Sequence, residues 1–229
     1  LAYEQQRQFE KAYDYLKKHV KKLEATHKGH LLSKVNELDI QHSISMIERR
    51  ANIDTLSGVH TRYYLESTCD AWLKEAHQKK DHICCFVFDV DDFKMINDQY
   101  GHLVGDEVIQ AVGQKCKEVM YEKDTLVGRY GGDEFVILLK NFSQEQIIDK
   151  ANELFQALSN MTVSSDEHKI QFTISMGMVC NSSIIARKFK QLFSVADQAL
   201  YMAKNQGKNQ IVSLSNMNCK FNNSPHSSS

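Results

Sequence analysis

The chain has 229 residues, which is enough for one well-filled domain with appendages. Its composition is 42% hydrophobic and 25% charged with a formal net charge of −1, as in an ordinary globular protein, so no electrostatic case exists for nucleic acid or an anionic membrane as the main partner. The longest apolar run, residues 83–88, is too short to cross a bilayer, and we expect no membrane-spanning segment within this chain.

The six cysteines show neither a C-x-x-C motif nor a framework spacing. We therefore expect reduced, buried thiols in a cytoplasmic protein. No signal peptide is visible, and the chain opens on Leu1 rather than on Met. These features fit the cytoplasmic part of a larger or membrane-anchored protein, and any sensor is expected either upstream of this chain or within residues 1–52.

Residues 1–52 contain no proline and one glycine, and their apolar residues recur at three- and four-residue steps, which indicates a helical stripe. The stripe comprises Phe9, Tyr13, Leu16, Val20, Leu23, Leu31, Val35, Leu38, Ile44 and Ile47. Around Gly29 the step lengthens, which indicates either a stutter in a coiled coil or a break between two helices. We interpret the segment as a long signalling or dimerisation helix. A helix packed back on its own domain is the alternative.

A polar link at residues 54–62 leads into a helix with apolar positions at Leu65, Cys69, Trp72, Leu73 and Ala76. Residues 77–82 are expected to form a loop. Residues 83–88 are all apolar, which favours a buried central strand, and this strand ends abruptly in the acidic run DVDD (89–92). A glycine-containing loop is expected over residues 97–106. The helix after it carries Val108, Ile109, Val112, Cys116 and Val119 on one face.

The stretch LVGRYGGDEFVILL (126–139) places two apolar runs on either side of Gly131 and Gly132. This pattern predicts a tight β-hairpin, because a turn with positive φ favours glycine. A plain hairpin does not need the adjacent acids Asp133 and Glu134 at the foot of its returning strand. Since side chains at a hairpin tip project clear of the sheet, these acids could reach a metal or a substrate phosphate.

The remaining elements are a helix, an alternating strand, a final helix and a short strand. The first helix carries Ile147, Ala151, Leu154, Phe155 and Leu158 on one face. Residues 170–180 alternate between apolar and polar, which predicts one half-buried strand. The final helix ends near Gly207, before a strand at 210–214, and the Asn/Ser-rich residues 216–229 are predicted to be disordered. The order of elements predicts an α+β fold with a mixed sheet flanked by helices.

Two acidic features belong to strands that would be neighbours in such a sheet. Asp89 ends the buried strand and Asp133 lies at the hairpin tip, so both carboxylates would meet at one edge. Hard oxygen ligands suit Mg²⁺, which takes its remaining ligands from water and phosphates. An aspartate at a strand end is, alone, more often a cap or turn residue. The acidic run together with the hairpin acids favours the metal site.

Five motifs in this order resemble the GGDEF-domain diguanylate cyclases. They are DTLSGVHTR (54–62), FDVDDFKMIND (88–98), GHLVGD (101–106), RYGGDEF (129–135) and ADQALYMAKNQGKN (196–209). The resemblance runs from about Asp54 to Leu214. It implies a nucleotidyl-cyclase-like domain with a ferredoxin-like core over residues 53–215, after a helical segment at 1–52 and before a tail at 216–229.

The resemblance also implies the reaction. Two GTP condense to cyclic di-GMP with release of two pyrophosphates, and each 3′-hydroxyl attacks the other α-phosphate across a homodimer joined through the N-terminal helix. Mg²⁺, with Mn²⁺ as a substitute, would be held by Asp89, the Val90 carbonyl and Asp133. Asp133 would also be the catalytic base, assisted by Glu134.

The same resemblance assigns the nucleotide contacts. Asn97 and Asp106 would read guanine, and His102 would lie near the base or ribose. Gly131 and Gly132 would let the ribose and α-phosphate approach the backbone. Phosphate contacts would come from Lys94, Lys204, Lys208 and backbone N–H groups near Phe93. A pair between Asp54 and Arg129 would tie the entry segment to the hairpin.

The chain departs from the family pattern at three places. Glu122 and Thr125 stand where the Arg-x-x-Asp product-inhibition motif would lie, which argues against feedback there. Lys208 replaces the usual arginine, which keeps the charge and loses bidentate phosphate binding. Ser57 and His60 differ from the entry motif and are expected to be tolerated. A non-catalytic GTP-binding or interaction module is the alternative function.

Overall fold

The computed structural model describes residues 52–214 apart from 80, 166, 167 and 183, together with residues 13, 15–23, 27, 34 and 37. The chain divides into two compact units, Leu1–Arg49 and Arg50–Ser229. The described residues of the first unit are helical. The rest of the predicted N-terminal stripe and the tail at 216–229 lie outside the described residues, so the long helix and the disordered tail stay predictions. None of the helices that the structure describes is long and apolar enough to span a bilayer.

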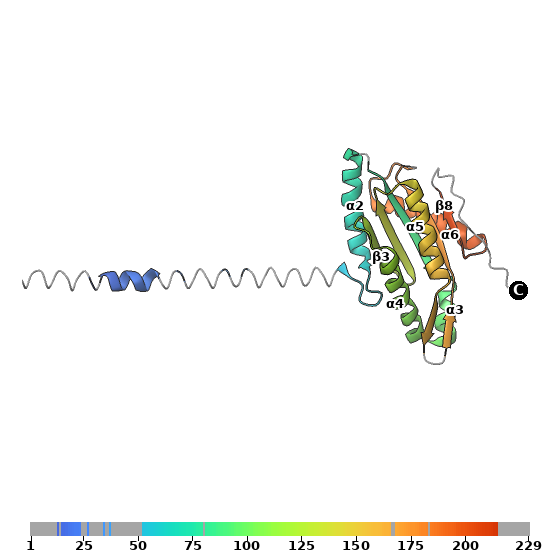
Figure 1. The fold of residues 1–229 in the computed structure, drawn as a ribbon, viewed down its shortest axis with the longest axis horizontal. Helices are drawn as coiled ribbons and strands as arrows, with labels where there is room; N and C mark the ends of the chain where they lie inside the picture. The colour runs from blue at the N-terminus through green and yellow to red at the C-terminus, as the bar shows by residue number, and fades with distance from the viewer. Residues whose placement is uncertain are drawn as a thin grey trace, which may run out of the picture. The chain divides into compact units, whose positions relative to one another are not determined.

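The second unit is built from eight strands and five helices within its described part (Figure 1). In chain order they are β1 (His60–Thr61), α2 (Arg62–Lys79), β2 (Ile83–Val90), α3 (Phe93–Tyr100), α4 (His102–Val119), β3 (Thr125–Gly131), β4 (Glu134–Lys140), α5 (Gln144–Ser159), β5 (Thr162–Ser165), β6 (His168–Gln171), β7 (Ile174–Cys180), α6 (Phe189–Asn205) and β8 (Ile211–Ser213).

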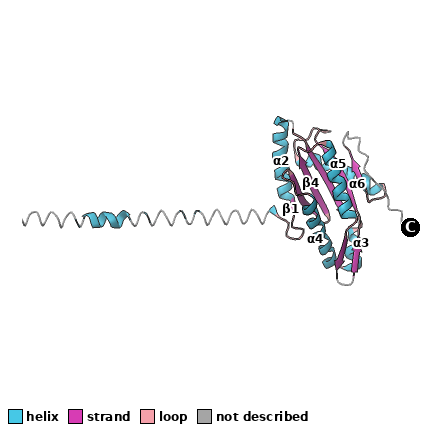
Figure 2. Cartoon of the chain, viewed as in Figure 1, coloured by secondary structure: helices cyan, strands magenta, loops and turns pink. Residues whose placement is uncertain are grey.

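The main sheet has six strands in the order β1-β3-β4-β2-β7-β8, and β5 and β6 form a separate hairpin. The two edge strands pair in parallel with their neighbours, and the four inner strands pair antiparallel. Figure 2 shows the strands lying between helices. The predicted mixed sheet flanked by helices is therefore confirmed.

Helices cover the sheet on both faces, and the burial of β2 illustrates this. All eight residues of β2 are buried, because alternate side chains enter two different apolar clusters. Phe86 and Phe88 join the cluster formed with α4 and α5, whereas Cys85 and Val87 join the cluster formed with α2 and α6. A strand buried on both faces carries a continuous apolar run, which is why Asp89 near its end is conspicuous.

Two expected elements differ in the structure. The predicted loop over residues 97–106 is helical, because α3 and α4 are separated only by Gly101, whose φ is 90°. The single strand predicted over 170–180 is divided between β6 and β7, and β7 is buried on both faces. Its polar positions do not face water: Ser175 is 0% exposed and donates a hydrogen bond to Asp91.

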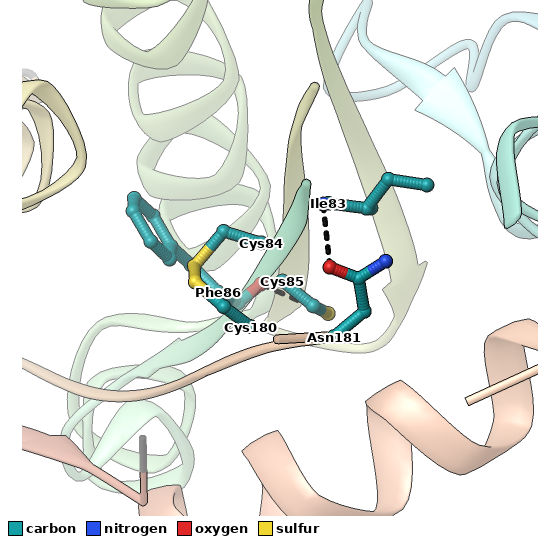
Figure 3. The surroundings of a disulfide bond; sticks show 6 residues. All are labelled: Ile83, Cys84, Cys85, Phe86, Cys180 and Asn181. Carbon is teal, nitrogen blue, oxygen red and sulfur yellow. Dashed lines mark hydrogen bonds between the residues drawn. A yellow bond between two sulfur atoms is a disulfide. The ribbon is translucent and has the colours of Figure 1, made fainter. Parts of the chain in front are cut away.

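The expectation that all cysteines are reduced is wrong for one pair. Cys84 of β2 and Cys180 of β7 form a disulfide (Figure 3). They are directly opposed in the antiparallel register with Cα atoms 4.0 Å apart, so their side chains meet on the same face of the sheet. Beside it, Asn181 Oδ1 accepts a hydrogen bond of 3.0 Å from the N–H of Ile83. Cys69, Cys85 and Cys116 are buried free thiols.

Candidate active site

The β3–β4 hairpin presents a bare turn. Gly132 has a φ of 55°, and a Cβ built on Gly131 or Gly132 would meet no atom within 4 Å. A hydrogen bond from Arg129 holds the turn: its Nε donates to the Gly132 carbonyl at 2.8 Å. Arg129 Nη1 donates to Asp54 Oδ1 at 3.1 Å, so the predicted Asp54–Arg129 pair is confirmed. The hairpin backbone is thus open to a ligand and fixed to the entry segment.

Three carboxylates converge beside this turn. Strand β2 pairs antiparallel with β4, and Asp89 is directly opposite Glu134 in the register. Asp133 precedes Glu134 at the start of β4. Asp89 is 8% exposed, whereas Asp133 and Glu134 are partly buried. The meeting of acids at one sheet edge follows from β2 and β4 being neighbours.

Lys204, from the last turn of α6, forms an ion pair with Asp89 Oδ2. The other oxygen, Asp89 Oδ1, is buried and has no hydrogen-bond partner. A buried carboxylate oxygen without a partner is costly and fits a cation ligand. The described residues contain no group of three or more His, Cys, Asp or Glu side chains arranged to hold a metal ion. The oxygen donors present, Asp89 with its unpaired Oδ1, Asp133 and the Val90 carbonyl, nevertheless fit an ion such as Mg²⁺, which completes its shell with water and phosphate oxygens.

Burial raises the pKa of all three acids above their ordinary values. Burial raises the pKa of Asp89 to about 6, helped by repulsion from Asp133 and Asp91 and opposed by Lys204. Burial and repulsion from Asp197 and Asp89 raise the pKa of Glu134 to about 7. Burial also raises the pKa of Asp133. The edge carries a surplus of negative charge, which a bound cation would relieve.

The predicted nucleotide contacts lie on α3 and α4. Phe93, Lys94 and Asn97 belong to α3, and His102 and Asp106 are exposed on the first turns of α4. A Cβ on Gly105 would come within 1.9 Å of Asn97 Oδ1. The Asn97 amide therefore rests on the backbone of α4, one residue away from Asp106. The absence of a side chain at Gly105 lets the two predicted guanine contacts lie close together.

Sequence reasoning missed Asp91. It is 6% exposed and accepts hydrogen bonds from Thr173 Oγ1 at 2.6 Å, Ser175 Oγ at 2.7 Å and the Asn209 N–H at 3.1 Å. These donors come from β7, from the residue before it and from the turn after α6. Asp91 therefore fixes the end of β2 beside Asp89. The one available signal was its i+2 spacing from Asp89 in the acidic run.

A lysine-centred cluster lies where the product-inhibition motif would fall. Lys150 Nζ is 2.7 Å from Glu122 Oε1 and 2.9 Å from Glu153 Oε2, and it lies over the ring of Tyr121. Thr125 Oγ1 and Glu122 Oε2 are buried without hydrogen-bond partners. A glutamate already neutralised by a lysine is not an anion-binding group.

The part of the chain that contains this site is similar to known proteins. The family model described as diguanylate cyclase, GGDEF domain, matches residues 51–210. Diguanylate cyclase A of Treponema denticola is 33% identical over 140 residues, covering 61% of this chain and 37% of that protein. Diguanylate cyclase DgcZ of Escherichia coli is 28% identical over 182 residues, covering 77% of this chain and 58% of that protein. The chain thus spans less than two thirds of the length of either relative.

The fold has a close counterpart among solved structures. The coiled coil and GGDEF domain of DgcB from Caulobacter crescentus, in complex with c-di-GMP, matches with a TM-score of 0.73 and 23% identity. The match covers 81% of this chain and 98% of that chain. At this identity the likeness shows the fold alone, and it agrees with the mixed sheet described above.

Proposed function

The chain belongs to the GGDEF family of diguanylate cyclase domains, and we propose that it condenses two GTP into cyclic di-GMP with release of two pyrophosphates. The observation that supports this most is the meeting of Asp89, Asp133 and Glu134 at one sheet edge, beside the bare Gly131–Gly132 turn. The reaction needs oxygen ligands for a metal next to a surface that a ribose and phosphate can approach closely. This edge offers both.

The metal ligands in this proposal are the carboxylates of Asp89 and Asp133 and the carbonyl of Val90. Mg²⁺ is the expected ion, and Mn²⁺ has the same preference for hard oxygen ligands. When bound, such ions lower the pKa of the attacking 3′-hydroxyl and neutralise charge on the leaving pyrophosphate. The buried, unpartnered Asp89 Oδ1 is the oxygen best suited to contact the ion.

The chain's own groups bind the triphosphate and move the proton. Asp133 accepts the proton of the 3′-hydroxyl at a carboxylate oxygen. Glu134, the next residue in the chain, assists Asp133 in this proton transfer. Lys94, Lys204 and Lys208 bind phosphate oxygens, with backbone N–H groups near Phe93. The glycine turn admits the ribose and α-phosphate because no Cβ intervenes.

Guanine is read by Asn97 and Asp106 in this proposal. A carboxylate can accept hydrogen bonds from the N1–H and the exocyclic amine of guanine, a pair of donors that adenine lacks. ATP would leave the Asp106 acceptors unpaired, and a site built on such hydrogen bonds rejects the analogue strongly. His102, exposed one turn before Asp106, lies near the base or the ribose.

Catalysis across two active sites requires a homodimer, since each subunit presents one GTP to the other. We propose that residues 1–52 join the subunits, that residues 53–215 form the catalytic domain and that an upstream sensor controls their approach. The reaction would take place in the cytoplasm, where GTP is found. The pair between Asp54 and Arg129 would couple the entry segment to the catalytic turn.

The alternative is a GTP-binding or interaction module without turnover. Such a module has no need of all the acids of the signature, and this chain keeps Asp89, Asp133 and Glu134 together in one edge. Binding of GTP with no product, in Mg²⁺ and at high protein concentration, would favour this alternative.

Substrate choice tests the proposed guanine contacts. Incubating the protein with equal amounts of GTP and ATP in Mg²⁺ should yield cyclic di-GMP alone, as identified by chromatography and mass spectrometry. Asp106→Asn should lower kcat/KM for GTP by about 10- to 100-fold, because the carboxylate loses one of its two acceptor positions. A mixed purine dinucleotide in comparable yield would contradict the assignment of Asp106.

A further inference from the structure

Three residues of the candidate site hold left-handed backbone conformations although they are not glycine. The φ angles are 57° at Asp92, 62° at Lys208 and 44° at Asn209, and Asn141 is the other such residue in the described part of the chain. Asp and Asn adopt this conformation more readily than most residues, whereas at Lys208 it is costly and persists only where the surroundings fix it. The β2–α3 turn and the turn after α6 are therefore constrained at the same place.

Two contacts join these turns. The N–H of Asn209 donates to Asp91 Oδ2 at 3.1 Å, which fixes the backbone beside Lys208 to the end of β2. Lys208 Nζ in turn lies 2.6 Å from Asp92 Oδ1. The Lys208 and Asp92 side chains are 42% and 51% exposed, so the backbone is held while the charged tips remain open to solvent and ligand.

Lys204 and Lys208, which are both proposed to bind phosphate, thus each form an ion pair with an aspartate. Lys204 rests on Asp89, which is also a proposed metal ligand, so a cation at Asp89 would weaken that pair and release the lysine. Asp92 belongs to no proposed metal set. Because Asp92 contacts the Lys208 ammonium and brings a negative charge beside it, a substrate phosphate that binds Lys208 has to compete with Asp92 for that ammonium.

We propose that Asp92 competes with the phosphates of the substrate for Lys208 and thereby lowers the affinity of the site for GTP. This inference rests on the proposed function, because it requires a phosphate to bind at Lys208. Asp92 is then a residue that acts through Lys208 rather than on the substrate itself. Because exposed ion pairs are weak and screened by salt, its removal should change affinity by about two- to fivefold.

Asp92→Asn is the matched variant, because asparagine has the same shape and tolerates the left-handed conformation. Inorganic pyrophosphate is titrated calorimetrically into the full chain in Mg²⁺, a condition in which no turnover occurs. The dissociation constant of pyrophosphate should fall about two- to fivefold in Asp92→Asn, and the gain should shrink at high salt. Guanosine, which has no phosphate, should bind wild type and variant equally.

A double-mutant cycle separates the pair from its surroundings. In a Lys208→Gln background the Asp92→Asn substitution should change the pyrophosphate affinity no more than a general loss of charge does, because no lysine remains for Asp92 to hold. Asp98→Asn, the same loss of charge at an exposed position of α3, should have a smaller effect than Asp92→Asn. Equal effects of the two substitutions would mean a general electrostatic influence and would overturn the proposal. Weaker or unaltered binding by Asp92→Asn would overturn it as well.

Failure of the proposed function would give a different experimental result from failure of the competition at Lys208. If wild type bound neither pyrophosphate nor GTP in Mg²⁺, the nucleotide site itself would be wrong, and the competition at Lys208 would fall with it. If wild type binds both and Asp92→Asn does not tighten binding, only the competition is rejected.

Discussion

Asp89 presents two different oxygens to its surroundings. Oδ2 is neutralised by Lys204, while Oδ1 is buried without a hydrogen-bond partner, and burial raises the pKa of the group to about 6. Buried carboxylate oxygens are usually paired in folded proteins. The incomplete pairing of Asp89 is the residue-scale observation that most supports the proposed cation site.

Asp54 allows a residue-scale test of the contact between the entry segment and the catalytic hairpin. Burial alone would raise the pKa of Asp54, but hydrogen bonds from Ser57 and Arg129 outweigh it and hold the pKa below its ordinary value. A lowered pKa stabilises the fold above the unfolded-state value near 3.8, and this stability is lost as the pH falls through the folded-state pKa.

We therefore expect Asp54→Asn to reduce the free energy of unfolding by about 1 kcal/mol at pH 7, a small value because the pair is partly exposed. The difference from wild type should shrink as the pH falls below about 4. Urea unfolding of both proteins at pH 7 and in mild acid measures this. A difference that is the same at both pH values would show that the charge of Asp54 is not what matters.

At the scale of elements, the approach of α3 to α4 brings the proposed guanine contacts together. Gly105→Ala places a Cβ against the Asn97 amide, which is the flexible end of a side chain and can move aside. The fold should survive while KM for GTP rises about tenfold, the equivalent of one lost hydrogen bond. Steady-state kinetics together with a thermal melt measure the two effects.

Gly113→Ala on the same helix is the contrasting variant. There the added Cβ would meet the backbone of Ser57 at 2.2 Å, and backbone cannot move aside as easily. This substitution should lower the melting temperature, in contrast to Gly105→Ala. Unchanged KM in Gly105→Ala would contradict the position assigned to Asn97.

The sequence predicted the elements whose patterns are local. The hairpin, the buried β2 and the amphipathic α4, α5 and α6 appear near their expected places. The second half of α3 and the first turn of α4 are predicted as a loop because Gly101 and Gly105 resemble breaks. Gly105 is instead buried inside a helix, where its missing side chain makes room for Asn97. Close approach and chain reversal both select glycine, and sequence alone does not separate them.

Features that depend on register could not be predicted. The disulfide needs Cys84 and Cys180 to be opposed across β2 and β7, and nothing local in the sequence specifies that pairing. The hydroxyl of Ser175 looked solvent-facing because strand alternation cannot reveal a buried acceptor such as Asp91. In the candidate site, the motif residues were predicted individually, whereas the contacts Asp91–Asn209 and Asp92–Lys208 required the fold.

At the scale of the whole molecule, product feedback is the property that the ion pair between Lys150 of α5 and Glu122 bears on. The Lys150–Glu122 pair occupies the place of the family's inhibitory motif. We expect added cyclic di-GMP to leave the initial rate unchanged, apart from competition with GTP at the active site. Initial rates over a matrix of GTP and product concentrations measure this, and a noncompetitive fall in rate would contradict it.

We propose that two copies of the carboxylate edge, one from each subunit, perform the reaction on GTP. The most direct measurement is the initial rate of cyclic di-GMP formation from GTP in Mg²⁺ by wild type and by Asp133→Asn, with circular dichroism to verify the fold of each. Wild type should form product, and Asp133→Asn should be slower by about 10²- to 10⁴-fold, because it loses a metal ligand and the proton acceptor. No product from wild type at high protein concentration, or a wild-type rate in Asp133→Asn, would contradict the account.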